Sequence, residues 1–388
     1  ARSGHRSQAL AQYENLCRSL QEELGAEPSA ETQALSEAIL FGKLAPAPDL
    51  LLGSPVSVWN LPSSLTPFFG RTEELATLEA TLAEADARLV TLTGMGGSGK
   101  TRLALEAGSR LAERERQALA EQSPLPFPHG IAFAPLAALD SIEGLAPALA
   151  EALRLRLEGG QEQLLEFLRR KQILLILDNL EQLLDGVELL SELLRTAPGV
   201  KILATSRERL QMQGEHVISL GGLPYPVQES ECSLAQAADL DACLAASPAL
   251  QLLLDGIRRI RPDFVPSSVD LPTMVGVCRL VDGLPLALEL AASWADALSL
   301  DDILLEARRS LDFLRVDWPD LPPRHRSLYA VFDVSWQRLS PAEQAAFSSL
   351  TVFGGGLTQE AARQVVTGAE AMPRLLAALV RKSFLQYD

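Results

Sequence analysis

The chain has 388 residues, of which 47% are hydrophobic, and it carries a formal net charge of −16 at pH 7. This length exceeds one ordinary core, so we expect about two to four domains. The acidic charge argues against direct binding of nucleic acid, because phosphate contacts need clustered lysine and arginine. No run of roughly 18 apolar residues is present, so we expect no membrane-spanning helix and a cytoplasmic location. The first residues lack an apolar signal-peptide core, and we interpret the chain as part of a longer protein.

The first 66 residues divide into a helical part and a linker. Apolar residues recur at helical spacing in residues 6–24, after which Gly25 ends that helix and Ser29 begins another. We therefore expect a helical hairpin over residues 1–41. Residues 42–66 are rich in Pro, Ser and Gly and lack periodicity, which predicts a linker.

Short apolar runs alternate with amphipathic helical segments between residues 67 and 225. The expected strands are residues 88–94, 130–136, 172–178, 200–206 and 216–222. Near-continuous apolar strands that alternate with helices predict an α/β domain, in which a parallel sheet has helices on both faces. Ligands bind at the carboxyl ends of the strands in such sheets.

The strand pattern stops after residue 225. Residues 226–315 show only helical patterns, which predicts an all-α domain. Residues 316–388 form a last compact segment, in which helical patterns flank a glycine-rich turn at residues 353–356.

The segment GMGGSGKT matches the complete P-loop pattern G-x-x-x-x-G-K-[ST] between an expected strand and an expected helix. Its glycines let backbone N–H groups close around phosphates, and the helix that follows points its positive end at them. Lys100 is expected to reach the β and γ phosphates, and the Thr101 hydroxyl to bind Mg²⁺. The nucleotide-binding residues predicted here are Gly94, Gly96, Gly97, Ser98, Gly99, Lys100, Thr101 and Arg102.

A carboxylate ends the expected strand at residues 172–178. Asp178 stands where a P-loop protein needs an acid that holds Mg²⁺ through water, although an Asp at a strand end is otherwise a turn or cap former. The next residue is Asn179 rather than a second acid, so we expect slow hydrolysis. Glu181 is a weak candidate for the catalytic base, because Glu at a helix start is more often a partner of the helix dipole.

Two further positions follow downstream. Arg207 comes directly after the expected strand at residues 200–206, where an arginine could reach a γ-phosphate and report its presence. The alternative is an exposed arginine at a helix start. Pro285, in the segment DGLPLALELAA, lies close to the start of a helix, which by itself indicates helix capping only.

These motifs together resemble a known family. In order, FFGR at residues 68–71, the P-loop, LLILDN, LATSR and GLPLA resemble the STAND class of P-loop ATPases of the NB-ARC-like type. The chain is most similar to bacterial regulators of the AfsR/SARP type, and the resemblance covers essentially its whole length. Residues 6–35 are similar to the end of the bacterial transcriptional activator domain that precedes the ATPase in such regulators.

The resemblance implies a role for several residues. Phe69 and Arg71 would contact adenine or its ribose, and Pro285 would lie against adenine with Leu286 beside it. Arg207 would be the sensor arginine that acts with Lys100 and Asp178, while Thr101 and Asp178 would bind the metal. Residues 316–388 would form a winged helix that packs on the closed state. Family members carry a further His just past that winged helix, and His325 stands too early to be it.

The resemblance also implies a function. ADP with Mg²⁺ would keep such a chain closed, and ATP would open it and permit self-association. DNA would be bound only by a domain outside this chain, and a C-terminal sensor would also lie outside it. The alternatives are a turnover ATPase, a non-transcriptional STAND sensor of the defence type that uses the same switch, and direct DNA binding by the C-terminal segment.

Overall fold

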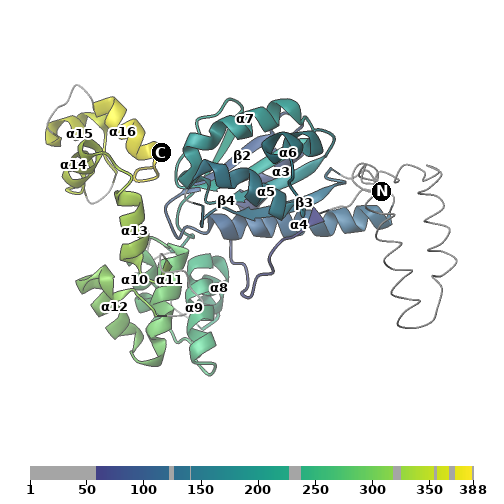
Figure 1. The fold of residues 1–388 in the computed structure, drawn as a ribbon. Coiled ribbons are helices and arrows are strands. Elements are labelled where there is room, and N and C mark those ends of the chain that lie inside the picture. The colour runs from purple at the N-terminus through teal and green to yellow at the C-terminus, as the bar shows by residue number, and fades with distance from the viewer. Residues whose placement is uncertain are drawn as a thin grey trace, which may run out of the picture. The chain divides into compact units, whose positions relative to one another are not determined.

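The computed structural model describes residues 58–386, except residues 122–125, 140, 227–236, 318–324, 354–355 and 367–371. The helical hairpin predicted over residues 1–41 lies outside the described residues, as does most of the linker predicted over residues 42–66. The described part contains a parallel sheet with helices on both faces, followed by two groups of helices (Figure 1).

The sheet has six strands in the order β1-β3-β4-β5-β2-β6, and every pair of neighbours is parallel. Its strands are β1 (Val58–Trp59), β2 (Leu89–Gly94), β3 (Gly130–Pro135), β4 (Ile173–Asp178), β5 (Val200–Ser206) and β6 (Glu215–Leu220). All residues of β2 and β4 are buried, which is the burial expected of near-continuous apolar strands. The predicted parallel sheet is confirmed, and its last strand ends at Leu220 rather than at residue 222.

Strand β1 corrects the predicted linker, because Val58 and Trp59 pair with Gly130 and Ile131 of β3. Asn60 extends this attachment, since its Oδ1 accepts a hydrogen bond from the Phe133 amide at 2.6 Å. Gly130 permits the close approach: its φ is 99°, and a Cβ there would lie 2.1 Å from the Val58 carbonyl oxygen. A two-residue strand carries no periodicity, so the sequence pattern did not indicate it.

Helices cover both faces of the sheet and bury two separate apolar clusters against it. One face carries α3 (Thr72–Ala83) and α4 (Lys100–Ala120), and the other carries α5 (Leu145–Ala152), α6 (Gly160–Leu168) and α7 (Val187–Thr196). Neighbouring residues of one strand point into different clusters, as Leu174 and Leu175 of β4 do. Helix α4 begins at Lys100, directly after the P-loop, so the sheet and this helix together position the predicted phosphate site.

The first group of helices after the sheet has its own apolar core, which contains Leu253, Met274 and Leu288. Its helices are α8 (Ala237–Ala246), α9 (Pro248–Ile260), α10 (Asp270–Leu280), α11 (Pro285–Ala292) and α12 (Leu300–Arg309). Among the described residues, no single helix is long and apolar enough to cross a membrane, although the pair Leu240–Ala246 and Pro248–Ile260, bent by 105°, passes that test together. Much of α9 is buried in the core of this group.

The second group of helices has a separate core, to which Leu350, Met372 and Leu379 belong. Its helices are α13 (Leu328–Trp336), α14 (Pro341–Leu350), α15 (Gln359–Val365) and α16 (Met372–Arg381). The described residues after 316 contain no β-strand, apart from an isolated antiparallel bridge between Arg315 and Ser327. The winged-helix assignment of residues 316–388 therefore stays a prediction.

Candidate nucleotide-binding site

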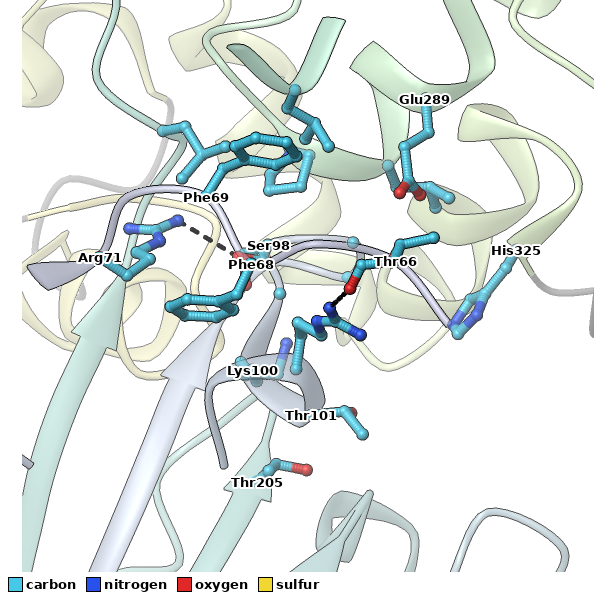
Figure 2. A pocket seen from close by; sticks show the side chains of 18 of the residues that line it. Thr66, Phe68, Phe69, Arg71, Ser98, Lys100, Thr101, Thr205, Glu289 and His325 are labelled. Carbon is cyan, nitrogen blue, oxygen red and sulfur yellow. Dashed lines mark hydrogen bonds between the residues drawn. The ribbon is translucent and has the colours of Figure 1, made fainter. Parts of the chain in front are cut away.

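A cavity of about 260 Å³ lies between the P-loop and the start of helix α11 (Figure 2). It opens at the carboxyl ends of the strands, where an α/β sheet binds its ligands. The predicted site residues that line it are Phe69, Arg71, Gly96, Gly97, Ser98, Gly99, Lys100, Thr101, Arg102, Arg207, Pro285 and Leu286. Gly94 and Asp178 stand just behind this lining, at the ends of β2 and β4. The structure thus brings together residues from segments that are far apart in the sequence.

Helix α11 rests directly on the P-loop. The Leu286 amide donates a hydrogen bond to the Gly97 carbonyl at 3.3 Å. Gly97 has a φ of 81°, and a Cβ at this position would lie 2.8 Å from the Leu286 Cβ. Only glycine combines that backbone conformation with such a close neighbour. The approach positions Pro285 and Leu286 over the phosphate loop, and their contact with adenine, which the sequence resemblance implies, stays a prediction.

Lys100 is held inside the loop by two backbone carbonyls. Its ammonium donates hydrogen bonds to the carbonyl oxygens of Gly94 at 2.8 Å and Met95 at 2.9 Å. Burial lowers the pKa of Lys100 to about 8, against the opposing effects of the Glu181 and Asp178 carboxylates. Because an anion favours the charged form of an amine, phosphate in this loop would raise that pKa again.

Two hydroxyls converge on the carboxylate of Asp178. Thr101 Oγ1 donates to Asp178 Oδ1 at 2.5 Å, and Thr205 Oγ1 donates to the same oxygen at 2.7 Å. Burial raises the pKa of Asp178, and these two hydrogen bonds oppose the shift. Hydroxyl and carboxylate oxygens are the ligands that Mg²⁺ prefers, so the contact between Thr101 and Asp178 fits the metal that the sequence predicts.

Arg207 lies at the phosphate end of the cavity but is bound to helix α13. Its Nη1 donates to the Val331 carbonyl at 2.9 Å and to the Ser335 hydroxyl at 2.5 Å. Its Nε forms an ion pair with Glu181 Oε1 at 3.3 Å, and both side chains are buried. A Cβ on Gly96 would lie 3.2 Å from the Arg207 Cζ, so the guanidinium rests against the P-loop.

Glu181, the weak candidate for a catalytic base, is engaged with Arg207 and also accepts a hydrogen bond from Asn179 Nδ2 at 3.2 Å. Both contacts involve Oε1, and Oε2 is buried without a hydrogen-bond partner among the described residues. Held in this way, Glu181 is a partner of Arg207. A role as general base stays a prediction.

Arg71 and Arg102 use their guanidinium groups to organise the site. Arg71 Nη2 donates to the carbonyls of Ser98 at 3.2 Å and Gly221 at 2.5 Å, which ties the P-loop to the segment after β6. Arg102 Nη2 donates to the Thr66 carbonyl. Both side chains still line the cavity, and their contact with a nucleotide stays a prediction.

The cavity has an apolar side and a polar side. Phe69, Leu223, Leu252 and Pro285 supply apolar surface, which suits the flat faces of a base. Figure 2 shows Phe69 above Ser98, with Thr66, Glu289 and His325 further to the right.

The residues of this lining that sequence reasoning missed are Thr66, Pro67, Phe68, Asn179, Thr205, Leu223, Leu252, Glu289 and His325. Glu289 follows Pro285 by one helical turn, so helical spacing could have identified it. His325 was set aside because it precedes the position of the family histidine. It comes from a distant segment, and no local pattern predicts its place in the cavity.

Two family models match parts of the chain. Residues 1–40 match the bacterial transcriptional activator domain, and residues 67–204 match the AAA ATPase domain. The second match contains the P-loop and Asp178.

Three relatives illustrate the likeness. The uncharacterized protein Rv0894 of Mycobacterium tuberculosis is 30% identical over 331 residues, which are 83% of this chain and 75% of that protein. The same organism's Rv0890c, named as an HTH-type transcriptional regulator, is 30% identical over 312 residues, or 78% of this chain and 32% of that protein. The regulatory protein AfsR of Streptomyces griseus is 28% identical over 386 residues, or 91% of this chain and 34% of that protein.

These matches confirm the likeness to AfsR-type regulators in its coarse form and leave the NB-ARC assignment as a prediction. The chain spans only 32% of Rv0890c and 34% of AfsR. It covers 75% of Rv0894 at 30% identity. In this chain, a segment that matches the bacterial transcriptional activator domain precedes the AAA-type ATPase domain of an AfsR-like regulator. The chain belongs to the family of the mycobacterial protein Rv0894.

Proposed function

We propose that this chain is a nucleotide-dependent switch of a bacterial transcriptional regulator, which binds ADP or ATP with Mg²⁺ at its P-loop. Lys100 would bind the β and γ phosphates, and Thr101 and Asp178 would hold the metal. Phe69, Pro285 and Leu286 would contact the adenine side of the nucleotide. The contact between Thr101 and Asp178 and the match to an AAA ATPase domain support this assignment.

The observation that carries the proposal is the position of Arg207. Its guanidinium rests against Gly96 of the P-loop, yet it donates to Val331 and Ser335 of helix α13. Arg207 would have to exchange these partners in order to bind a γ-phosphate. A ligand shifts a conformational equilibrium only when it interacts differently with the two states, and this exchange supplies such a difference.

Other contacts join the C-terminal helices to the same edge of the sheet. Arg338 Nη1 donates to the Glu181 carbonyl at 2.8 Å and lies 3.4 Å from Glu208 Oε1. Ser383 Oγ donates to the Arg207 carbonyl at 2.7 Å. Because these contacts surround Arg207 and Glu181, a change at Arg207 would be transmitted to the whole C-terminal group.

The finer assignments follow the family resemblance. The chain would be a STAND-class, NB-ARC-like ATPase with a nucleotide-binding domain over residues 67–225, a helical domain over residues 226–315 and a winged helix over residues 316–388. The ADP-bound form would be closed, and the ATP-bound form would self-associate. Contact with DNA would be made by a domain outside this chain. The AfsR-like relatives favour a transcriptional output over a defence-type sensor.

Hydrolysis in such a switch would be slow. Glu181 Oε1 is engaged with Arg207 and Asn179, and the residue after Asp178 is an amide rather than an acid. Neither arrangement positions a base for an attacking water. Slow turnover would let each nucleotide state persist long enough to carry a signal.

The test is to denature the purified protein, identify the released nucleotide by chromatography and measure ATP turnover in parallel. We expect one ADP per chain and turnover far below about 1 s⁻¹, the low end of ordinary enzymes. A protein that releases no nucleotide and turns over ATP at about 1 s⁻¹ or faster would instead be a turnover ATPase, and the switch would be rejected.

A further inference from the structure

Glu289 is a half-buried acid that the proposed switch does not use. It lies on helix α11, lines the nucleotide cavity, and makes no hydrogen bond or ion pair within the part of the chain that the structure describes. Burial raises its pKa, and the charges of Arg259 and Arg102 oppose that shift. A carboxylate in such surroundings gains stability from donors that reach it. Figure 2 shows it pointing from α11 toward Thr66.

The position of Glu289 along α11 indicates which part of a nucleotide it faces. The helix begins at the P-loop, where the Leu286 amide donates to the Gly97 carbonyl and Pro285 Cγ lies 3.9 Å from the Cβ position of Gly99. Glu289 follows Pro285 by four residues, so it stands on the same face and one turn, roughly 5–6 Å, further from the phosphate loop. The ribose of a nucleotide is bonded directly to the phosphate chain, so when the P-loop binds the phosphates the ribose lies next to the loop, at about this distance.

The chemistry of the two sides of the cavity points the same way. Phe69, Leu223 and Leu252 belong to one apolar cluster, and their side chains, which offer hydroxyls no hydrogen-bond partner, suit a base. Glu289 lines a polar part of the cavity with Thr66 and His325, to the right of Phe69 in Figure 2. A carboxylate repels phosphate oxygens and accepts hydrogen bonds from hydroxyls, so this part suits a sugar with free hydroxyl groups.

We propose that Glu289 binds the 2′- and 3′-hydroxyls of the nucleotide ribose and makes the site selective for ribonucleotides over deoxyribonucleotides. This inference rests on the proposed binding of adenine nucleotides. It adds a residue that selects the sugar. The Arg102 guanidinium, held by the Thr66 carbonyl, and the charge of Arg259 favour the ionised form of this carboxylate, which accepts hydrogen bonds, and so oppose the effect of burial on its pKa.

The test compares the dissociation constants of ADP, 2′-deoxy-ADP and 3′-deoxy-ADP, measured by calorimetry on the purified protein stripped of nucleotide. A hydrogen bond to a charged group contributes about 1.5–3 kcal/mol, so we expect each deoxy analogue to bind the wild type about 10- to 100-fold more weakly than ADP. In Glu289→Gln the ratio should fall to about threefold or less. The ratio is taken within one variant, so a general loss of stability cancels from it.

Glu306→Gln is the matched control, because Glu306 lies on α12, outside the cavity lining, and pairs with Arg309 at 2.6 Å. It should keep the wild-type ratio. Deoxy analogues that bind the wild type as tightly as ADP would overturn the ribose role while the switch stands, and so would an unchanged ratio in Glu289→Gln. No binding of ADP to the wild type would overturn both this inference and the proposed function.

Discussion

Arg207 Nη1 donates a hydrogen bond to the Ser335 hydroxyl at 2.5 Å, across a separation of 128 residues. Arg207 is 6% exposed and Ser335 is 7% exposed, so water competes little for either group. The sequence predicts Arg207 as a γ-phosphate sensor. In the structure its side chain is instead hydrogen-bonded to helix α13 of the C-terminal group. Under the proposed switch, helix α13 and a γ-phosphate are alternative partners of the same guanidinium.

Replacement of Arg207 by Ala should weaken the binding of ATP and leave the binding of ADP almost unchanged. ADP lacks the γ-phosphate, so its affinity should stay within about threefold, whereas ATP should lose a charge-assisted contact and bind about tenfold or more weakly. Calorimetric titration with both nucleotides measures the effect. Arg209→Ala, at the exposed residue two positions on, is the matched control and should change neither affinity. An equal loss for ADP and ATP would show that Arg207 is not a γ-phosphate sensor.

Replacement of Ser335 by Ala should raise the affinity for ATP relative to that for ADP. The change removes one acceptor that holds Arg207 on α13 and leaves the Val331 carbonyl in place. Arg207 then loses one hydrogen bond fewer when it moves to a γ-phosphate. The affinity for ATP relative to ADP should therefore rise about three- to tenfold. Ser348→Ala, on the exposed surface of α14, should leave the ratio unchanged. A ratio that stays at the wild-type value in Ser335→Ala would argue against competition for Arg207.

Replacement of Lys100 by Ala should abolish tight nucleotide binding and leave the fold intact. Two charge-assisted contacts to phosphate are worth about 3 kcal/mol or more, so the affinity for ADP should fall at least about 100-fold. The circular dichroism spectrum should be unchanged, because Lys100 contacts only carbonyls of its own loop among the hydrogen bonds that the described residues form. Arg116→Ala, an exposed cation of the same helix, is the control. Undiminished binding by Lys100→Ala would reject the phosphate assignment.

The affinity for ADP should fall as the pH rises above about 8. In the free protein, burial lowers the pKa of Lys100 to about 8, whereas a bound phosphate would restore a higher value. Between these two pKa values the free protein has lost a proton that binding must restore, so affinity should drop up to about tenfold per pH unit. Calorimetry at pH 7.5, 8.5 and 9.5 in buffers of different ionisation enthalpy would measure both the affinity and the proton uptake. A flat profile, or proton release, would contradict the assignment.

Local patterns in the sequence were sufficient for strands β2 to β6 and for the phosphate loop. Strands β2 to β5 are short apolar runs, and the run of glycines before Lys100 carries its own backbone requirements. Asp178 was predicted because a strand end has a known place in a parallel sheet. Each of these features depends on residues that are neighbours in the chain, so their spacing alone carries the information.

The tertiary structure decided which distant residues share the cavity. Val58 and Trp59 join the sheet by pairing with β3, although a two-residue strand has no period to detect. His325 reaches the cavity, and Arg207 is bound by Ser335, through the packing of helices that are separate in sequence. By itself the sequence determined strands β2 to β6 and the P-loop, because these follow from short-range spacing. The partner of Arg207 and the polar side of the cavity were decided only when the helices packed, because contacts over long separations in the chain leave no local pattern.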